Sequence, residues 1–492
     1  MKTWYFIAPG LILTAIAGAD LLWRMAVTSP LPPQKPTANE LSIKNCRERE
    51  CRFLTISKPV RDGRIPEELA ELKHVTNLSL NGAGIKDLTP VGQMPWLESL
   101  SAFGGRLSPE QRINAFREAY GHENWRKIQS GRAKPEDFPP LETEAFTDLD
   151  GLNGLPSLQN LTLKNFDPID TSSLSHHQML TKLNIIYSVV SNPEVIGALP
   201  TLEELVLKGS SISDIGFLST APSLTFLDLS GTEVSDIAPL QDVKTLRSLV
   251  LSGNVTDLAP LSGLSQLAGV FGVGPGVTDL GPLRTLSNLR RLRIQRSDIA
   301  DLGPIANAGQ LRDLEINGSK IADLSPLAGM TKLEVFQLYN SLAEDLSPLA
   351  DSKKLEILFV GNTPITKLDG LQDLPVLQRL RLQGIAATDY SVLGELKTLD
   401  ELDLSASPVR DINFVASLSQ LEDLFLSGTP IEDISPLAGL PRLRRVNLRG
   451  TRVRDFTPLL TLPNLAWVLL EPTSGIDPDL IKALKEKGVN VL

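Results

Sequence analysis

Aspartate recurs along most of this sequence at a nearly constant interval. It stands at Asp214, Asp236, Asp257, Asp279, Asp301, Asp323, Asp345, Asp389, Asp411, Asp433 and Asp455. The interval is 22 residues, apart from one of 21 and one of 44, where Lys367 takes the skipped place. A column of carboxylates could bind calcium, but each aspartate comes just before a short turn, where a carboxylate can accept hydrogen bonds from free backbone N–H groups. We therefore predict that these aspartates cap turns.

The histidines do not assemble a catalytic centre in the sequence. His122-Glu123 does not begin a zinc-protease motif, because Arg126 stands where the second histidine would fall. His176 and His177 are adjacent, but neither comes with a nucleophile and an orienting group. The sequence therefore predicts no catalytic residue, no cofactor and no metal site.

Cys46 and Cys51 are the only cysteines, and they stand directly ahead of a strand-like segment, 53–56. In an exported chain, two cysteines this close favour a disulfide that staples the first coil. The alternatives are two free thiols or half of a metal site. Zinc is disfavoured, because there are only two sulfurs and no histidine before His74.

The aspartates belong to a longer repeated unit. Its clearest copy is residues 421–440, LEDLFLSGTPIEDISPLAGL. Leu421, Leu424 and Leu426 predict a short strand, and Thr429 and Asp433 then mark a tight turn and a compact return segment. One unit is too short to enclose its own apolar side chains, so the leucines are buried only when successive units stack. A fixed period of this length is typical of a solenoid.

The unit, L-x-x-L-x-L-x-x-(N/S/T)-x-I/V-x-D-I/L-x-P-L, resembles the leucine-rich repeat in the 22-residue bacterial form found in internalins. The resemblance covers about residues 75–102 and 149–470. It implies an α/β solenoid, a leucine-rich-repeat horseshoe with a parallel β-sheet on its concave face and short turns or 3-10 segments on its convex face.

One position departs from the family. The resembled repeat usually has asparagine after the strand, whereas here the place holds Ser210, Thr232, Ser297, Ser319, Ser341, Thr363, Ser407, Thr429 and Thr451. Hydroxyls can still bond backbone groups of a turn, so we expect a chemically different ladder.

The N-terminal segment favours export. Lys2 precedes an uncharged, mostly apolar run over residues 3–19, which fits either a secretory signal cleaved after Ala17-Gly18-Ala19 or an uncleaved anchor. An anchor would leave the repeats outside the cytoplasm, and cleavage would give a periplasmic or secreted protein. Neither a wall-sorting L-P-x-T-G motif nor a lipobox cysteine is present.

The chain divides into six predicted parts. They are a signal peptide or N-terminal membrane anchor at 1–27, a proline-rich linker at 28–45, an N-terminal cap with the first repeats at 46–102, a helical insert at 103–143, the leucine-rich repeat array at 144–470 and a C-terminal cap at 471–492. The insert either carries binding or covers an apolar edge. The C-terminal cap is expected to hold a helix over 480–487 and a final strand over 489–492.

One coil of the array looks weak. Gly272 stands where a core leucine belongs, Pro275 stands where a hydroxyl belongs, and the 21-residue step lies just before them. We expect a local loosening or a bend there.

The residue between the last two leucines of each strand should face out of the sheet on its concave side. Aromatic side chains in this column or beside it are the best candidates for contact with a partner. They are Phe271, Phe359, Phe425, Tyr339 and Trp467. The alternative is that they only reflect the preference of strands for such residues.

Arginines in the same columns stand one repeat from acids. A shift of 22 brings Arg291, Arg293, Arg379, Arg381 and Arg445 beside Asp313, Glu315, Glu401, Asp403 and Asp423. We therefore predict cross-strand ion pairs rather than a basic patch.

The bulk properties and the predicted face together favour protein binding. The chain has 492 residues and a formal net charge of −10, so it is not a nucleic-acid binder by bulk charge. The concave face, roughly 80 Å long before curvature, suits a protein partner rather than a metabolite. We predict a non-enzymatic protein-protein interaction protein of the cell envelope. The alternatives are a structural envelope protein without a single ligand and, less favoured, an enzyme using the helical insert or the residues near His176.

Overall fold

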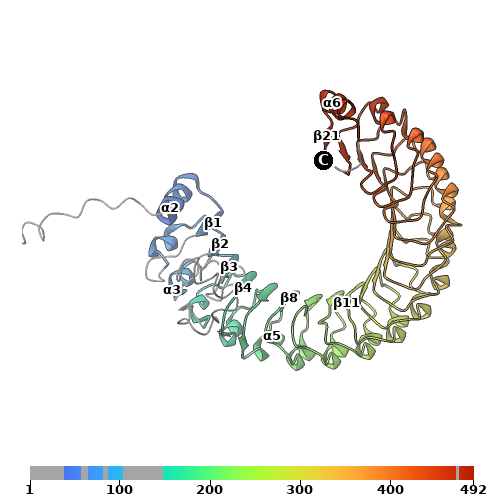
Figure 1. Ribbon diagram of the computed structural model, residues 1–492. Helices are drawn as coiled ribbons and strands as arrows, with labels where there is room; N and C mark the ends of the chain where they lie inside the picture. The colour runs from blue at the N-terminus through green and yellow to red at the C-terminus, as the bar shows by residue number, and fades with distance from the viewer. Residues whose placement is uncertain (1–37, 57–64, 81–86, 104–147, 472–475) are drawn as a thin grey trace, which may run out of the picture.

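The computed structural model describes residues 38–56, 65–80, 87–103, 148–471 and 476–492, and it forms an open horseshoe (Figure 1). A 19-stranded parallel sheet lines the inner side of the arc, and short helical turns line the outer side. Each strand of the sheet pairs with the next along the chain, apart from β5 and β7, which pair with each other. The predicted solenoid is confirmed.

The strands of the large sheet are β1 (Phe53–Ile56), β2 (Asn77–Leu80), β3 (Ser99–Phe103), β4 (Asn160–Lys164), β6 (Lys182–Ile186), β8 (Glu204–Val206), β9 (Phe226–Asp228), β10 (Ser248–Val250), β11 (Gly269–Val273), β12 (Arg291–Gln295), β13 (Asp313–Asn317), β14 (Val335–Tyr339), β15 (Ile357–Gly361), β16 (Arg379–Gln383), β17 (Glu401–Asp403), β18 (Asp423–Phe425), β19 (Arg445–Asn447), β20 (Trp467–Leu469) and β21 (Asn490–Val491). The small sheet holds β5 (Ile169–Asp170) and β7 (Val190–Ser191).

The helical segments are mostly single 3-10 turns. Among the described residues, the α-helices are α2 (Ala38–Arg49), α3 (Thr89–Gly92), α5 (Glu194–Gly197) and α6 (Pro478–Glu486). The 3-10 turns are η2 (Glu67–Glu71), η4 (Asp150–Leu152), η5 (Ser172–His176), η6 (Gly216–Thr220), η7 (Ala238–Asp242), η8 (Ala259–Gly263), η9 (Gly281–Thr285), η10 (Gly303–Ile305), η11 (Ser325–Leu327), η12 (Ser347–Asp351), η13 (Leu371–Asp373), η14 (Ser391–Glu395), η15 (Asn413–Ser417), η16 (Ser435–Leu437) and η17 (Thr457–Thr461).

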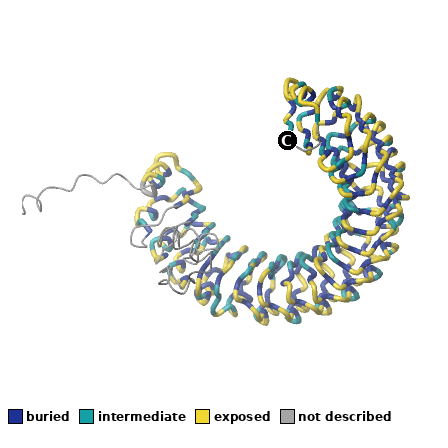
Figure 2. The backbone as a smooth tube through the Cα atoms, in the orientation of Figure 1, coloured by how far each residue is buried: buried dark blue, intermediate teal, exposed yellow. Residues whose placement is uncertain are grey.

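The core runs through the coils as one continuous apolar column (Figure 2). In the unit of residues 421–440, Leu421, Leu424, Leu426, Ile431 and Leu437 are fully buried. Each buried side chain of this size stabilises the fold by about 1.5 to 3 kcal/mol. Because these side chains belong to one continuous buried cluster, each coil depends on its neighbours for stability.

The repeated aspartates cap turns, as predicted. In all eleven, Oδ1 accepts a hydrogen bond from the backbone N–H two residues later, at 2.6 to 2.9 Å. That N–H lies in the first turn of a short helical segment, where no carbonyl of the same segment can reach it. The column of carboxylates is thus a column of turn caps.

The hydroxyl column lies inside the coils. Its residues from Ser210 to Thr429 are buried. Thr429 Oγ1 donates to the carbonyl of Leu426, at 2.7 Å, and Thr232 and Thr451 do the same in their own coils. These three threonines therefore bond within one coil, unlike an asparagine that bridges two, whereas Thr363 Oγ1 has no hydrogen-bond partner among the described residues.

The backbone turns through the left-handed region one residue ahead of the hydroxyls in most coils. Glycine occupies this place at Gly209, Gly231, Gly318, Gly384, Gly428 and Gly450. Other coils hold Tyr187, Arg296, Asn340, Asn362 and Ala406 there, with φ between 50° and 57°. The same exit from the strand recurs whether or not glycine is present.

The N-terminal end is closed by α2, which packs against β1. The predicted linker over 28–45 is therefore wrong for residues 38–45, which lie in α2. The last proline before the helix is Pro36, and Ile43 and Cys46 are buried against the first coil. A disulfide joins Cys46 to Cys51, where the sequence predicts one.

Two other predicted features lie outside the described residues. They are the N-terminal signal or anchor, 1–27, and the helical insert, of which only Phe103, at the end of β3, is described. The strands on either side of the insert, β3 and β4, pair directly from Ser99 with Asn160 to Phe103 with Lys164, so the repeat resumes in register. No helix in the described part of the chain is long and apolar enough to cross a bilayer.

The weak coil contains a bulge. Val270 pairs with Leu292, but the register then shifts and Val273 pairs with Ile294. Gly272, with φ of 73°, is one of the extra residues, and Val273 is fully buried. The prediction that Gly272 stands in the place of a core leucine is wrong, because the bulge moves Val273 into that place.

The C-terminal end is closed by α6, as predicted. Asp477 caps the helix by accepting from the Asp479 backbone N–H at 2.9 Å, and Gly488, with φ of 83°, follows its end. Leu480 and Leu484 are buried against the last coil. The chain then adds β21 beside β20.

Candidate functional site

The concave face of the sheet carries two kinds of surface. In the described part of β2 to β6, the two concave columns hold mostly amides and hydroxyls, including Asn77, Ser99, Thr162 and Asn184. From β11 to β20 most positions of the same columns hold aromatic or charged side chains. All five predicted contact residues lie in this second part.

The strand register places the five aromatics on the concave face as expected. The central column runs from Arg293 through Glu315, Gln337, Phe359, Arg381, Asp403, Phe425 and Asn447 to Leu469. Phe271, Phe359, Phe425 and Tyr339 are half-buried, whereas Trp467 is 43% exposed. Only Tyr339 and Phe359 lie on neighbouring strands; the other three are isolated from them along the arc.

Tyr339 and Phe359 are each held in place by the adjoining strand. A Cβ added to Gly361 would lie 2.7 Å from Tyr339 Cδ1, so the tyrosine ring covers the bare backbone of β15. The Arg381 guanidinium lies over the Phe359 ring, 4.3 Å from its centroid. A cation over an aromatic face contributes about 0.5 to 2 kcal/mol, more when water is excluded.

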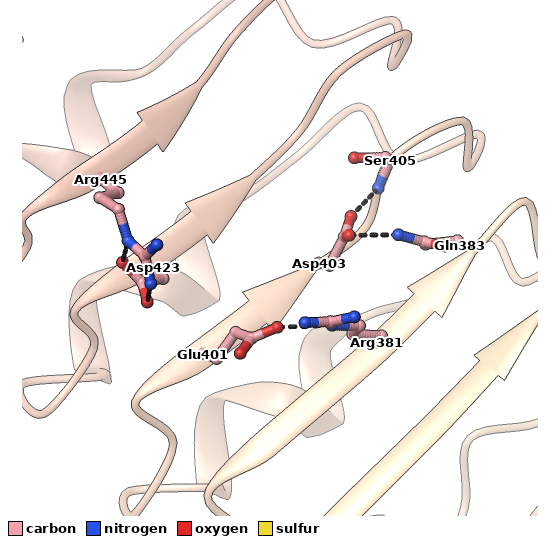
Figure 3. A network of polar contacts seen from close by, with 7 residues as sticks. All are labelled: Arg381, Gln383, Glu401, Asp403, Ser405, Asp423 and Arg445. Carbon is pink, nitrogen blue, oxygen red and sulfur yellow. Dashed lines mark hydrogen bonds and ion pairs between the residues drawn. The ribbon is translucent and has the colours of Figure 1, made fainter. Parts of the chain in front are cut away.

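Arg381 is fixed from its other side by an acid of β17. Its Nε donates to Glu401 Oε1 at 2.5 Å, and Glu401 is only 9% exposed (Figure 3). Burial acts to lower the pKa of Arg381, but the hydrogen bond and charge of Glu401 outweigh it and the pKa is raised. The guanidinium is therefore charged at every relevant pH.

Asp403 is held by a separate set of bonds. It accepts from the Gln383 side chain and, at 2.9 Å, from the Ser405 backbone N–H (Figure 3). Burial raises the pKa of Tyr339, and among the smaller influences Arg381 lowers it while Asp403 and Glu401 raise it. We call these five residues, Tyr339, Phe359, Arg381, Glu401 and Asp403, the Phe359 patch.

The predicted cross-strand ion pairs are partly right. Arg293 pairs with Glu315 at 3.2 Å, and Arg445 pairs with Asp423 (Figure 3). Arg381, however, reaches Glu401 rather than Asp403, and Arg291 lies over the Phe271 ring, 5.6 Å from its centroid. Arg293 keeps its pair with Glu315 although it too lies over the Phe271 ring, 5.5 Å from the centroid.

The two adjacent histidines lie in different environments. His176 is exposed, and its Nδ1 lies 3.2 Å from the Ser173 carbonyl oxygen. His177 is buried, which lowers its pKa. Within the described residues, neither ring is hydrogen-bonded to an acidic or nucleophilic side chain.

Sequence reasoning missed how the Phe359 patch is built. The spacing of 22 between Phe359 and Arg381, and between Tyr339 and Gly361, is visible in the sequence and puts each pair on neighbouring strands. Stacking of arginine on phenylalanine, and of tyrosine on a bare glycine, could have been inferred from these two offsets.

Comparison with known proteins gives sequence and structural matches. The sequence family described as leucine-rich repeats (2 copies) matches residues 419–461. No curated protein matches the chain by sequence.

Among solved structures, an internalin of Listeria monocytogenes, InlF, is 31% identical, with a TM-score of 0.57 over 60% of this chain and 88% of its own. A leucine-rich repeat protein of Leptospira interrogans is 19% identical, with a TM-score of 0.61 over 93% of this chain and 100% of its own. The functional domain of InlJ from Listeria monocytogenes is 20% identical, with a TM-score of 0.52 over 65% of this chain and 69% of its own. The last two are similar in fold alone.

Proposed function

This chain belongs to the internalin-like leucine-rich repeat proteins, and we propose that it is a non-enzymatic protein of the cell envelope that binds another protein on its concave face. Fold alone does not fix a function, so the proposal depends on the face itself. The aromatic and arginine side chains that dominate most protein interfaces occur together on strands β11 to β20.

The Phe359 patch is the observation that carries the proposal. Its tyrosine, phenylalanine and arginine are ordered before any partner arrives, since Gly361, Glu401 and Arg381 each fix a neighbour. A surface that is already ordered loses little side-chain entropy on binding, and this favours affinity. The paired charges supply specificity more than strength.

The envelope location is supported by the N-terminal sequence. Residues 3–19 are uncharged and mostly apolar after Lys2, as in a signal or an anchor. The Cys46–Cys51 disulfide is consistent with an oxidising compartment. Mass spectrometry of the protein from its native host distinguishes a cleaved signal from an uncleaved anchor. A mature start at Asp20 indicates cleavage, and an intact N-terminus indicates an anchor.

Binding is tested with the full chain immobilised and used to capture surface proteins. The affinity of the captured partner is then measured for wild type, Phe359→Ala and Phe425→Ala. Loss of a contact that dominates an interface costs at least about 2 kcal/mol, so we expect Phe359→Ala to weaken binding about 30-fold.

Leu342→Ala is the matched control, because Leu342 is 55% exposed and follows β14 outside the sheet. It should bind as wild type does. Equal affinity of wild type and both phenylalanine variants would contradict the proposed face, and the absence of any saturable partner would favour a purely structural role in the envelope.

A further inference from the structure

Three side chains with metal-ligand chemistry meet in the N-terminal cap. Cys46 is buried in α2, Cys51 is half-buried just after that helix, and His74 is half-buried just before β2. Their ligand atoms all lie within 4.8 Å of one another. Cys46 Sγ and His74 Nε2 are 3.9 Å apart. The sequence separates His74 from Cys46 by 28 residues, so only the stacking of the first coils brings them together.

The distances can be compared with those of a tetrahedral metal site. Zinc bonds to sulfur at about 2.3 Å and to imidazole nitrogen at about 2.0 to 2.1 Å, which sets a sulfur-to-nitrogen distance of about 3.6 Å between two ligands. The 3.9 Å between Cys46 and His74 is within a few tenths of an ångström of that value. The two sulfurs would have to separate from bonding contact to about 3.8 Å, a movement that side-chain rotation can supply once the disulfide is reduced.

We propose that the reduced form of this cap is a binding site for a thiophilic divalent metal ion, with zinc as the best match, held by Cys46, Cys51 and His74. Two thiolates and one imidazole fill three positions of a tetrahedron, and the fourth is open to water. Disulfide and metal are alternative ways of stapling α2 to the first coil. The oxidised cap holds no thiolate and binds no metal.

The conversion is a balanced thiol exchange. Two equivalents of a small thiol reduce the Cys46–Cys51 bond, each giving up one proton and one electron, and they leave joined as a disulfide. The metal ion then displaces the protons of the two cysteine thiols and binds the lone pair of His74 Nε2. Metal binding itself consumes no oxidant. Reoxidation of the two cysteines by a small-molecule disulfide, which is reduced to two thiols, restores the Cys46–Cys51 bond and releases the metal.

The metal site also requires that its three ligands stay close together after the disulfide is broken. Arg47 on α2 pairs with Glu71 of η2 at 2.7 Å, which ties the helix to the segment that leads into His74. Ile43 and Cys46 are both buried against the first coil. The helix therefore stays near His74 when the disulfide is broken, and the three ligands remain within reach of one ion.

The test uses the full chain, either oxidised or reduced with a phosphine that is then removed without air, and Co²⁺ as the probe. The reduced chain should bind one Co²⁺ with the thiolate charge-transfer and visible bands of a tetrahedral site, and Zn²⁺ should displace it. The oxidised chain should show neither. His74→Ala should weaken binding at least tenfold, since loss of even an indirect metal partner costs about 10- to 100-fold.

His176→Ala is the control, because His176 is exposed and far along the chain in η5; it should bind as wild type does. His74→Cys keeps a ligand and should restore binding with a stronger thiolate band, which separates loss of a ligand from loss of the fold. The proposal is overturned if the reduced chain gives no such bands, if His74→Ala binds Co²⁺ as wild type does, or if the oxidised chain binds it equally.

Discussion

At the scale of single residues, the hydroxyl column contains both bonded and unbonded hydroxyls. Thr232, Thr429 and Thr451 donate to a carbonyl three residues earlier, at 2.7 to 2.8 Å. Ser297 and Ser341 are buried with no hydrogen-bond partner for their hydroxyls among the described residues. Thr363 is also buried with no hydrogen-bond partner for its hydroxyl among the described residues, so the residue type alone does not decide whether a hydroxyl is bonded.

Replacement of these hydroxyls should have opposite effects on stability. Ser297→Ala removes a buried, unpaired hydroxyl, so we expect the free energy of unfolding to rise by about 1 kcal/mol. Thr429→Ala removes a hydrogen bond and a methyl group, so we expect it to lower the free energy of unfolding by about 1 to 2 kcal/mol. Urea unfolding of both variants and wild type measures the difference. A destabilised Ser297→Ala would show that the hydroxyl is satisfied after all.

At the scale of elements, the bulge in β11 makes Gly272 indispensable. Its φ of 73° is in the left-handed region, and an added Cβ would lie 3.0 Å from the Leu251 carbonyl oxygen. Gly272→Ala should therefore lower the free energy of unfolding by at least about 1 to 2 kcal/mol. Gly253→Ala is the matched control from the preceding coil, since nothing lies within 4 Å of its added Cβ. Equal melting temperatures for the two variants would contradict the strain at Gly272.

The turn caps predict a loss of stability in acid. Hydrogen bonds from Ser325 and Ser391 lower the pKa values of Asp323 and Asp389 below the ordinary 3.8, and those from Thr457 lower that of Asp455. The folded chain therefore binds fewer protons than the unfolded chain, so this stabilisation is complete above the ordinary pKa and disappears as pH falls through the lowered values.

The measurement is the melting temperature from about pH 5 to about pH 2.5. A triple variant, Asp323→Asn, Asp389→Asn and Asp455→Asn, should show a shallower fall than wild type over this range, because asparagine has no charge to lose. Parallel curves would mean that the caps contribute nothing through ionisation.

Elements with a strict period could be predicted, and those without one could not. The 22-residue step located Leu424, Asp433 and their equivalents because each coil repeats the same burial. The same step misplaced Gly272, since a bulge is decided by pairing with β12, which no local pattern records. Helix α2 was also missed, because it occurs once and is held by contacts with β1 rather than by a repeat.

At the scale of the whole molecule, damage to one coil should destabilise its neighbours most. Leu358 is fully buried in β15, near the middle of the array, and Leu358→Ala should cost about 2 to 5 kcal/mol. Because each coil contacts only its neighbours, hydrogen exchange should accelerate most in β14, β15 and β16 and least at the two caps. Uniform acceleration along the chain would instead indicate a single cooperative unit.

The residues that line the concave face could be predicted, but not which of them act together as a site. Alternation and the 22-residue period fix which residues face outward, and the five aromatics are all on that side. Which of them act together depends on side-chain reach: Arg381 stacks on Phe359 and bonds Glu401, although Asp403 is its direct neighbour. The proximity of His74 to Cys46 is likewise a product of the folded cap.

The covered ends of the sheet affect how copies of this protein behave at high local concentration. A parallel sheet with bare outer strands offers unpaired amides and carbonyls that recruit further chains into fibres. Here α2 lies beyond β1 at one end, and α6 packs beside the two-residue β21 at the other (Figure 1). The protein can therefore present a long row of strands at high local density without growing end to end.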